Sequence, residues 1–273
     1  MPGDDQDALD DAIRGYYDAD QEDQRLFSRL GRLELVRTQE IVARYLSPVE
    51  LAILDVGGGT GVYAAWLAGL GHIVHLIDPV ALHVERAQAR AATNPDYTFT
   101  AEIGDARSLS ADDASFDAVL LFGPLYHLTD RADRLRALAE ARRVLQPGGR
   151  LFAVGISRFA PLLDGLREGW LDDPAFRQIV ERDLVEGQHR NPTVRQGWFT
   201  TAYMHHPDEL RDEVVEAGFT LDALYGVEGP GWCLNRDWDD PVMREQMLYA
   251  ARAVEREPTL LGISPHLLVV ARI

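Results

Sequence analysis

The sequence contains no lysine, so all 27 of its basic residues are arginine. They are outnumbered by 44 acidic residues, which gives a formal net charge of -17. A surface this acidic repels nucleic-acid phosphates and anionic lipids. We therefore expect neither nucleic acid nor a membrane as a partner, and a small neutral or cationic molecule fits better. Abundant alanine and arginine without lysine also indicate a high-GC bacterial genome.

Cysteine is almost absent too, because Cys233 is the only one. One cysteine excludes an internal disulfide and a cysteine zinc cluster. The N-terminus lacks the basic and apolar regions of a signal peptide. No apolar run approaches the roughly 18 residues of a membrane span. These absences predict a cytoplasmic protein.

The pattern of apolar residues divides the 273 residues into four parts. Helical spacing over about 8–46 predicts an N-terminal helical cap, 1–48. Apolar runs then alternate with helical segments, which predicts βαβ units and a parallel sheet over 49–156. Regularity fails in an aromatic-rich insertion, 157–204, which we interpret as a lid. Helix and strand patterns return over 205–273, the C-terminal part of the core.

The clearest motif is Asp55-Val-Gly-Gly-Gly-Thr-Gly61, where the first apolar run stops. Glycines there allow a tight turn and let a ligand lie against the backbone. A dinucleotide loop has the spacing G-x-G-x-x-G. Counting from Gly57, its third glycine would fall on Val62, so the spacing is G-x-G-x-G instead. Alone, the loop fits a structural turn or a nucleotide cofactor.

Two carboxylates follow later strands. Asp78 ends the second strand about 20 residues after the loop, where an acidic residue can accept from ribose hydroxyls. Alternatively, Asp78 is the N-cap residue of the next helix. Asp105 follows the third strand, where it can accept from an adenine amino group. Its alternative is an ordinary turn residue.

Together these elements resemble the class I methyltransferases that use S-adenosylmethionine (AdoMet). The resemblance covers about 51–154, including Phe116-Asp-Ala-Val-Leu-Leu-Phe122 and Arg143-Val-Leu-Gln-Pro-Gly-Gly-Arg-Leu151. It implies an α/β, Rossmann-like, seven-stranded and mostly parallel sheet with an antiparallel C-terminal hairpin. It also implies AdoMet as the cofactor. The core residues predicted to bind it are Asp55, Gly57, Gly59, Asp78, Pro79, Asp105, Ala106 and Phe122.

A narrower resemblance is to UbiE-type bacterial methyltransferases of small molecules, many in natural-product pathways. It rests on short matches at Tyr16-Tyr17, Gly31-Arg-Leu-Glu34, Arg37-Thr38, Gly123-Pro-Leu-Tyr-His-Leu128 and Thr200-Thr-Ala-Tyr-Met-His205. It implies that Tyr17, Arg25 and Arg37 lie near the methionine end of AdoMet, where a guanidinium can hold a carboxylate in a bidentate pair. The alternative for Arg37 is a pair with Glu34 on its own helix.

Methyl transfer needs an aligned acceptor and, for a phenol, amine or acidic carbon, a nearby base. His127, just after the fourth strand, is the predicted base or orienter, and Tyr126 could orient the acceptor instead. The alternative for His127 is capping of the next helix. The residues predicted to bind an aromatic acceptor, of indole or phenol type, are Tyr126, Phe159, Trp170, Trp198, Tyr203, His205 and Trp232. Several of these would equally form a small core within the lid.

Three other interpretations stay open. A metal-dependent O-methyltransferase would use Asp130 and Asp133, but both sit at an ordinary helix start, and we expect no metal. A non-catalytic AdoMet-binding regulator or partner subunit would keep the loop without needing an acceptor pocket. An NAD-dependent oxidoreductase is disfavoured by Val62. The acceptor, the methylated atom and the oligomeric state, homo-oligomer or monomer, stay undecided.

Overall fold

The computed structural model describes residues 26–94, 99–193, 195, 197–234 and 237–273. The fold consists of two compact units. We call the first the sheet unit; it comprises Glu40–Val154, Leu210–Leu224 and Leu268–Ile273. We call the second the helical unit; of the described residues it comprises 26–39 and those within Gly155–Glu209 and Tyr225–Leu267.

The sheet unit is built on parallel strands in the order β3-β2-β1-β4-β5. Their bounds are β1 (Ala52–Val56), β2 (Ile73–Asp78), β3 (Phe99–Ile103), β4 (Phe116–Leu121) and β5 (Leu145–Ser157). The central strand β1 places Leu54 opposite His75 of β2 and Val119 of β4. Four of its five residues are buried. Burial on both faces explains why β1 and β4 are mostly apolar in the sequence, with Asp55 and Asp117 as their acidic residues.

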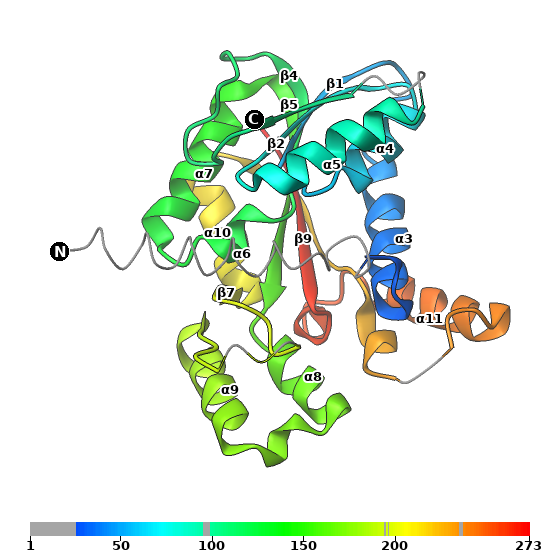
Figure 1. Cartoon of the computed structure of the whole chain (residues 1–273), viewed down its shortest axis with the longest axis vertical. Helices are drawn as coiled ribbons and strands as arrows, with labels where there is room; N and C mark the ends of the chain where they lie inside the picture. The colour runs from blue at the N-terminus through cyan, green and yellow to red at the C-terminus, as the bar shows by residue number, and fades with distance from the viewer. Residues whose placement is uncertain (1–25, 95–98, 194, 196, 235–236) are drawn as a thin grey trace. The chain divides into compact units, whose positions relative to one another are not determined.

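Helices cover this sheet. Their bounds are α4 (Val62–Gly69), α5 (Ala81–Ala92), α6 (Pro124–His127), α7 (Arg131–Val144) and α10 (Pro207–Glu216). α4 packs against β2 and β3, α5 packs against β2 and β3, and α7 packs against β4 (Figure 1). α7 begins at a capping side chain, since the Asp130 carboxylate accepts a hydrogen bond from Ala132 N at 2.7 Å.

A buried ion pair joins α7 to α10. The Arg134 guanidinium donates to both carboxylate oxygens of Glu213, at 2.7 Å to Oε1 and 2.9 Å to Oε2. Its remaining donors reach the carbonyls of Leu128 and Thr129. Both charged side chains are at most 3% exposed. Removal of either side chain would therefore destabilise the fold, because it takes away the main compensation of the other buried charge.

The helical unit contains the other elements. They are α3 (Arg29–Ala43, ending in the sheet unit), α8 (Ala160–Glu168), η1 (Trp170–Asp172), α9 (Pro174–Glu186), β6 (Gln188–His189), β7 (Ala202–His205), η2 (Gly229–Cys233), α11 (Pro241–Val254) and η3 (Leu261–Ile263). Both α9 and α11 start with an aspartate cap followed by proline. That combination satisfies the first backbone N–H groups and fixes the first helical φ angle.

Two further strands, β8 (Thr220–Gly226) and β9 (His266–Arg272), run through both units. β9 pairs with β5 and β8 and supplies the antiparallel C-terminal part of the sheet. The predicted Rossmann-like fold is therefore confirmed. Domain boundaries at 48, 156 and 204 stay predictions.

Three details differ from the sequence-based expectation. β5 begins at Leu145, not Arg150, because Leu145 pairs with Phe116 before an irregularity in register. The insertion contributes β6 and β7 to the sheet, which the aromatic pattern concealed. The predicted loop 228–240 contains the 3-10 helix η2. No helix in the described ranges has the length and apolar character to cross a membrane.

Candidate functional site

The glycine loop turns sharply at the carboxyl end of β1. Gly57, Gly59 and Gly61 all have positive φ angles, 70°, 56° and 80°, which side chains other than glycine seldom adopt. A Cβ on Gly57 would lie 2.6 Å from Pro124 Cδ, whereas one on Gly59 would meet nothing within 4 Å. The loop is thus packed against α6 at one end and leaves open space at Gly59.

Asp55 lies beneath this loop with its side chain fully buried. Neither carboxylate oxygen has a hydrogen-bond partner among the described residues. Burial, with a smaller effect from the charge of Asp78, raises the pKa of Asp55 to about 7. A Cβ on Gly58 would approach Asp55 Oδ2 to 2.7 Å, so the carboxylate lies directly against the loop. An unpartnered buried carboxylate here fits a ligand that carries positive charge, as AdoMet does.

Asp78 at the end of β2 connects the loop to α5. Its Oδ2 accepts from Gly59 N at 2.9 Å, and its Oδ1 accepts from Val80 N at 2.9 Å. His83 Nδ1 lies 3.1 Å from the same Oδ1. The N-cap of α5 is Val80 and has no side-chain cap, so Asp78 does not fill the capping role given above as the alternative. Its contact with Val80 closes a turn before the helix, and its contact with Gly59 turns the carboxylate toward the loop. Pro79, beside it, is exposed.

Asp105 follows β3 and is bound by a neighbouring arginine. Arg107 donates to Asp105 Oδ2 at 2.6 Å and to Asp133 Oδ2 at 3.0 Å. Ala106 is buried. Asp105 keeps 44% of its side chain exposed, so a further donor such as an amino group can still reach it.

Phe122, which follows β4, packs edge-on against Tyr63, with ring centroids 5.1 Å apart. Tyr126 and His127 lie next on α6, with ring centroids 4.6 Å apart, and both are half-buried. A Cβ on Gly123 would lie 3.2 Å from the Gly57 carbonyl oxygen. The predicted catalytic pair thus belongs to a short helix that begins on the glycine loop.

The carboxylates considered for a metal have other partners. Asp130 caps α7, as described above, and Asp133 pairs with Arg107 at 3.0 Å and with Arg136 at 3.5 Å. The capping bond explains why Asp130 stands at the start of a helix, and the ion pairs occupy the Asp133 carboxylate. Our expectation of no metal stays a prediction.

Arg37 is the described member of the predicted methionine-end group. Its side chain is fully buried; it forms an ion pair with Glu255 and donates from Nε to the Val227 carbonyl at 3.3 Å. Its role at the cofactor carboxylate stays a prediction. Tyr17 and Arg25 lie outside the described residues.

The aromatic residues predicted to bind an acceptor separate into different groups. Trp170 and Trp198 both pack on Phe176, with ring centroids 5.4 Å and 5.0 Å away, in an apolar cluster of the insertion. Trp232 lies instead in a cluster with Leu33. The first two therefore fit the alternative of a small internal core.

The remaining candidates lie closer to the strand ends. Phe159 lies against Gly262, where a Cβ would come within 2.7 Å of its ring. Tyr203 on β7 donates to Glu209 Oε2 at 3.2 Å. His205 is fully buried and lies edge-on to Tyr203, with ring centroids 4.8 Å apart. Acceptor binding by all of these residues stays a prediction.

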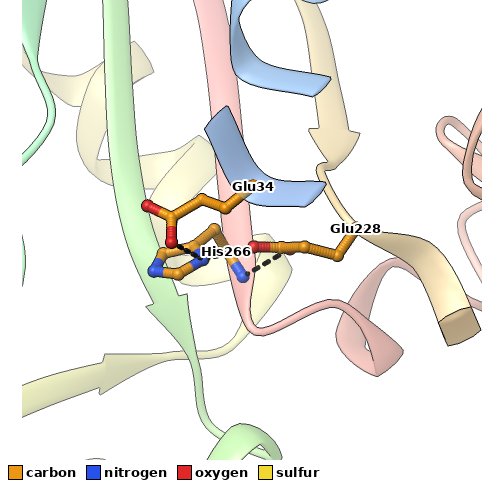
Figure 2. Close-up of side chains that lie close together, drawn as sticks. All are labelled: Glu34, Glu228 and His266. Atoms are coloured by element: carbon orange, nitrogen blue, oxygen red, sulfur yellow. Dashed lines mark hydrogen bonds and ion pairs between the residues drawn. The ribbon is translucent and has the colours of Figure 1, made fainter. Parts of the chain in front are cut away.

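Sequence reasoning missed one cluster in the helical unit, shown in Figure 2. Glu34 of α3, Glu228 after β8 and His266 at the start of β9 bring their ligand-type atoms within 4.8 Å of one another. Only the histidine at the start of the last strand could have drawn attention to it, since the partners are 38 and 232 positions away.

Comparison with known proteins decides the family. A family model described as a methyltransferase domain matches residues 53–149. The ubiquinone/menaquinone biosynthesis C-methyltransferase UbiE of Acidiphilium cryptum (strain JF-5) is 34% identical over 208 residues, which cover 73% of this chain and 78% of that protein. The chain belongs to the UbiE-like class I AdoMet-dependent methyltransferases. The methyltransferase is therefore an enzyme with AdoMet as its cofactor and a small molecule as its acceptor.

Other relatives agree with this membership. A ubiquinone biosynthesis O-methyltransferase of Methylocella silvestris is 36% identical over 137 residues, covering 49% of this chain and 50% of that protein. An AdoMet-dependent methyltransferase from Mesorhizobium loti has a TM-score of 0.61 at 20% identity, covering 88% of this chain and 100% of that one. The latter likeness concerns the fold. The dinucleotide and non-catalytic interpretations of the loop are thereby set aside in favour of an AdoMet-dependent enzyme.

Proposed function

We propose that this methyltransferase acts on a small aromatic acceptor of phenol or indole type, a natural-product intermediate, by in-line methyl transfer assisted by His127 as base or orienter. The packing of α6 on the glycine loop carries this proposal. Gly123 and Pro124 abut Gly57, so the helix that bears Tyr126 and His127 starts at the predicted cofactor loop. Groups on such a helix are suited to act beside the transferred methyl group.

The residues of the sheet unit fit the cofactor. Asp78 would accept from the ribose hydroxyls and Asp105 from the adenine amino group. Open space at Gly59 lets the ligand lie against the backbone, and the unpartnered Asp55 carboxylate offsets positive charge. When bound, AdoMet supplies an electrophilic methyl group on a sulfonium, and sulfur departs as a neutral thioether.

The chain's own part is positioning and proton control. Tyr126 and His127 lie edge-on to each other, and in this proposal the two rings form one wall of the acceptor site. Fixed geometry converts the reaction into an effectively unimolecular displacement. A phenolic acceptor must also lose its proton, and that step needs a base of suitable pKa.

The name of one relative points to a second candidate acceptor. The Acidiphilium protein is named for C-methylation in ubiquinone/menaquinone biosynthesis. By that similarity, a hydroquinone ring methylated at carbon is a second candidate acceptor. It shares the phenolic hydroxyl with the first, so both need the same proton removed.

The test measures transfer of label from methyl-labelled AdoMet to a panel of phenols, indoles, hydroquinones and aliphatic amines. We expect label on aromatic compounds; label on aliphatic amines alone would refute the acceptor class. His127→Ala should lower turnover by about 10²-fold or more if the residue is a base. A base loses its effect at high pH, whereas an orienter is needed at every pH. Unchanged turnover at both neutral and high pH would remove His127 from the mechanism, and His72→Ala serves as the control.

A further inference from the structure

The cluster of Glu34, Glu228 and His266 brings together three segments of the helical unit that are far apart in the sequence (Figure 2). Glu34 lies on α3, Glu228 follows β8, and His266 begins β9. One oxygen of each glutamate and one ring nitrogen of the histidine lie within 4.8 Å of one another. Because all three residues belong to one compact unit, the geometry of the cluster is defined within that unit.

The cluster buries more negative than positive charge. Glu228 is 2% exposed, Glu34 is 9% exposed, and the His266 side chain is 16% exposed. Two ionised carboxylates and an imidazolium still sum to one negative charge, and with a neutral imidazole they sum to two. The charge of Arg37, about one turn along α3, is matched by that of Glu255. A divalent cation at the centre of the cluster would compensate the excess negative charge.

Backbone hydrogen bonds hold Glu228 beside His266. Val227 N donates to the His266 carbonyl at 3.0 Å, and Gly229 N donates to Ser264 Oγ at 2.7 Å. The residues before and after Glu228 are thus both tied to the chain around the start of β9. The backbone therefore fixes the points from which these two side chains extend.

Further contacts orient the two glutamates. His266 N donates to Glu228 Oε2 at 3.2 Å, which leaves Glu228 Oε1 facing His266 Nδ1 at 2.5 Å. On α3, Arg37 Nε donates to the Val227 carbonyl at 3.3 Å, about one turn away from Glu34. Glu34 Oε2 lies 3.8 Å from His266 Nδ1. Outer contacts of this kind position the ligands of metal sites.

The donor set indicates the kind of ion. One imidazole nitrogen and two carboxylate oxygens, without a thiolate, suit zinc and other divalent transition metals. Calcium and magnesium prefer ligand sets made of oxygen alone. Zinc can take three protein ligands from histidine and carboxylates and complete its tetrahedron with a water molecule. The three side chains therefore match an open zinc site better than a calcium or magnesium site.

One distance must change when zinc binds. Two ligand atoms at about 2.1 Å from zinc in tetrahedral geometry are about 3.4 Å apart. Glu34 Oε2 and His266 Nδ1, which are 3.8 Å apart, are already close to that separation. Glu228 Oε1 and His266 Nδ1 are hydrogen-bonded at 2.5 Å and must separate by about 1 Å. Zinc therefore replaces the proton of this hydrogen bond.

We propose that Glu34 Oε2, Glu228 Oε1 and His266 Nδ1 bind one zinc ion. The ion has a structural role, because it links α3 to the start of β9 within the helical unit. The site is separate from Asp130 and Asp133, the carboxylates on which our sequence-based expectation of no metal rested. The proposal goes beyond methyl transfer and does not depend on the acceptor proposed above.

The experiment titrates zinc sulfate into the untagged full chain after chelator treatment and measures binding by calorimetry and bound metal by mass spectrometry. We expect one zinc ion per chain. At a zinc concentration of about a hundred times Kd, the unfolding midpoint should rise by about 5–10 °C. Glu34→Gln, Glu228→Gln and His266→Gln should each weaken zinc binding by about 100-fold or more. His75→Gln is the matched control, because it removes another histidine near a glutamate, 3.3 Å from Glu102; its zinc binding should equal that of wild type.

Three results would overturn the proposal. The wild-type protein could bind no stoichiometric zinc, or the three glutamine variants could bind zinc as tightly as wild type does, which would mean an adventitious ion only. Should the variants not fold, wild-type protein with ¹⁵N-labelled histidine decides. One equivalent of zinc should shift the ring nitrogen signals of one of the eight histidines. No shift, or equal shifts at several histidines, contradicts the site.

Discussion

The buried carboxylate under the glycine loop makes stability depend on pH in an unusual direction. Asp55 is fully buried without a hydrogen-bond partner among the described residues, and its pKa is raised from 3.8 to about 7. Between these values the folded protein binds more protons at this site than the unfolded chain does. Its free energy of unfolding therefore falls as pH rises through this window and levels off above pH 7.

Asp55→Asn removes the titration and keeps the shape of the side chain. A shift from 3.8 to about 7 corresponds to about 4 kcal/mol of stability lost at high pH. From pH 5 to pH 8 the wild-type protein should lose about 2 to 3 kcal/mol of this amount. The amide has its own burial cost, but that cost does not change with pH. The stability of the variant relative to wild type should therefore rise by about 2 to 3 kcal/mol over this interval.

Thermal unfolding of the ligand-free protein at pH 5 and pH 8 measures the effect. A change of 1 kcal/mol moves the midpoint by about 2–4 °C for a chain of this size. Asp173→Asn is the control, because Ala175 N donates to Asp173 Oδ1 at 2.9 Å and this bond lowers the pKa of the Asp173 carboxyl; the relative stability of this variant should not rise with pH. A difference between Asp55→Asn and wild type that is the same at both pH values would refute the reasoning. Saturation with S-adenosylhomocysteine should shrink the effect, since its ammonium group supplies a partner.

Three other predictions address packing and the cofactor site. Arg134→Ala should cost about 3 kcal/mol of unfolding free energy, because it removes the buried bidentate partner of Glu213 and leaves the more distant Arg131, at 3.7 Å; the double variant Arg134→Met with Glu213→Leu should recover most of it in denaturant titrations. Gly57→Ala should destabilise more than Gly71→Ala: both have positive φ, but only at Gly57 would the Cβ meet a proline ring, at 2.6 Å. Equal midpoints would contradict this packing. Asp78→Ala should raise the AdoMet KM more than it lowers kcat, and unchanged affinity in calorimetry would count against its ribose role.

Local patterns were enough to predict most of the sheet unit. The strands β1 and β4 are mostly apolar because most of their residues are buried. α7 could be located from the aspartate that caps it and from its apolar spacing. The order of the glycine loop, Asp78 and Asp105 along the chain was enough to predict the cofactor. These signals lie within short windows, so sequence alone carries them.

Contacts between distant segments could not be predicted in this way. Nothing near His266 in the sequence indicates that Glu34 lies beside it, because side chains far apart in the chain are brought together by packing alone. The same holds for Trp198 and Trp232, which look alike in the sequence but lie in different apolar clusters. An aromatic residue predicts burial, and only the fold decides which core it joins.

The tight packing of Gly57 on Pro124 has a consequence for the order in which ligands bind. The glycine loop is in contact with the first residue of α6. A ligand that fixes the conformation of the loop therefore also fixes the position of the helix that bears Tyr126 and His127. Filling the loop first therefore prepares the surface that the second ligand meets. Steady-state kinetics should show a compulsory sequence, with the methyl donor entering first and S-adenosylhomocysteine leaving last, so that S-adenosylhomocysteine inhibits competitively against AdoMet and non-competitively against the acceptor.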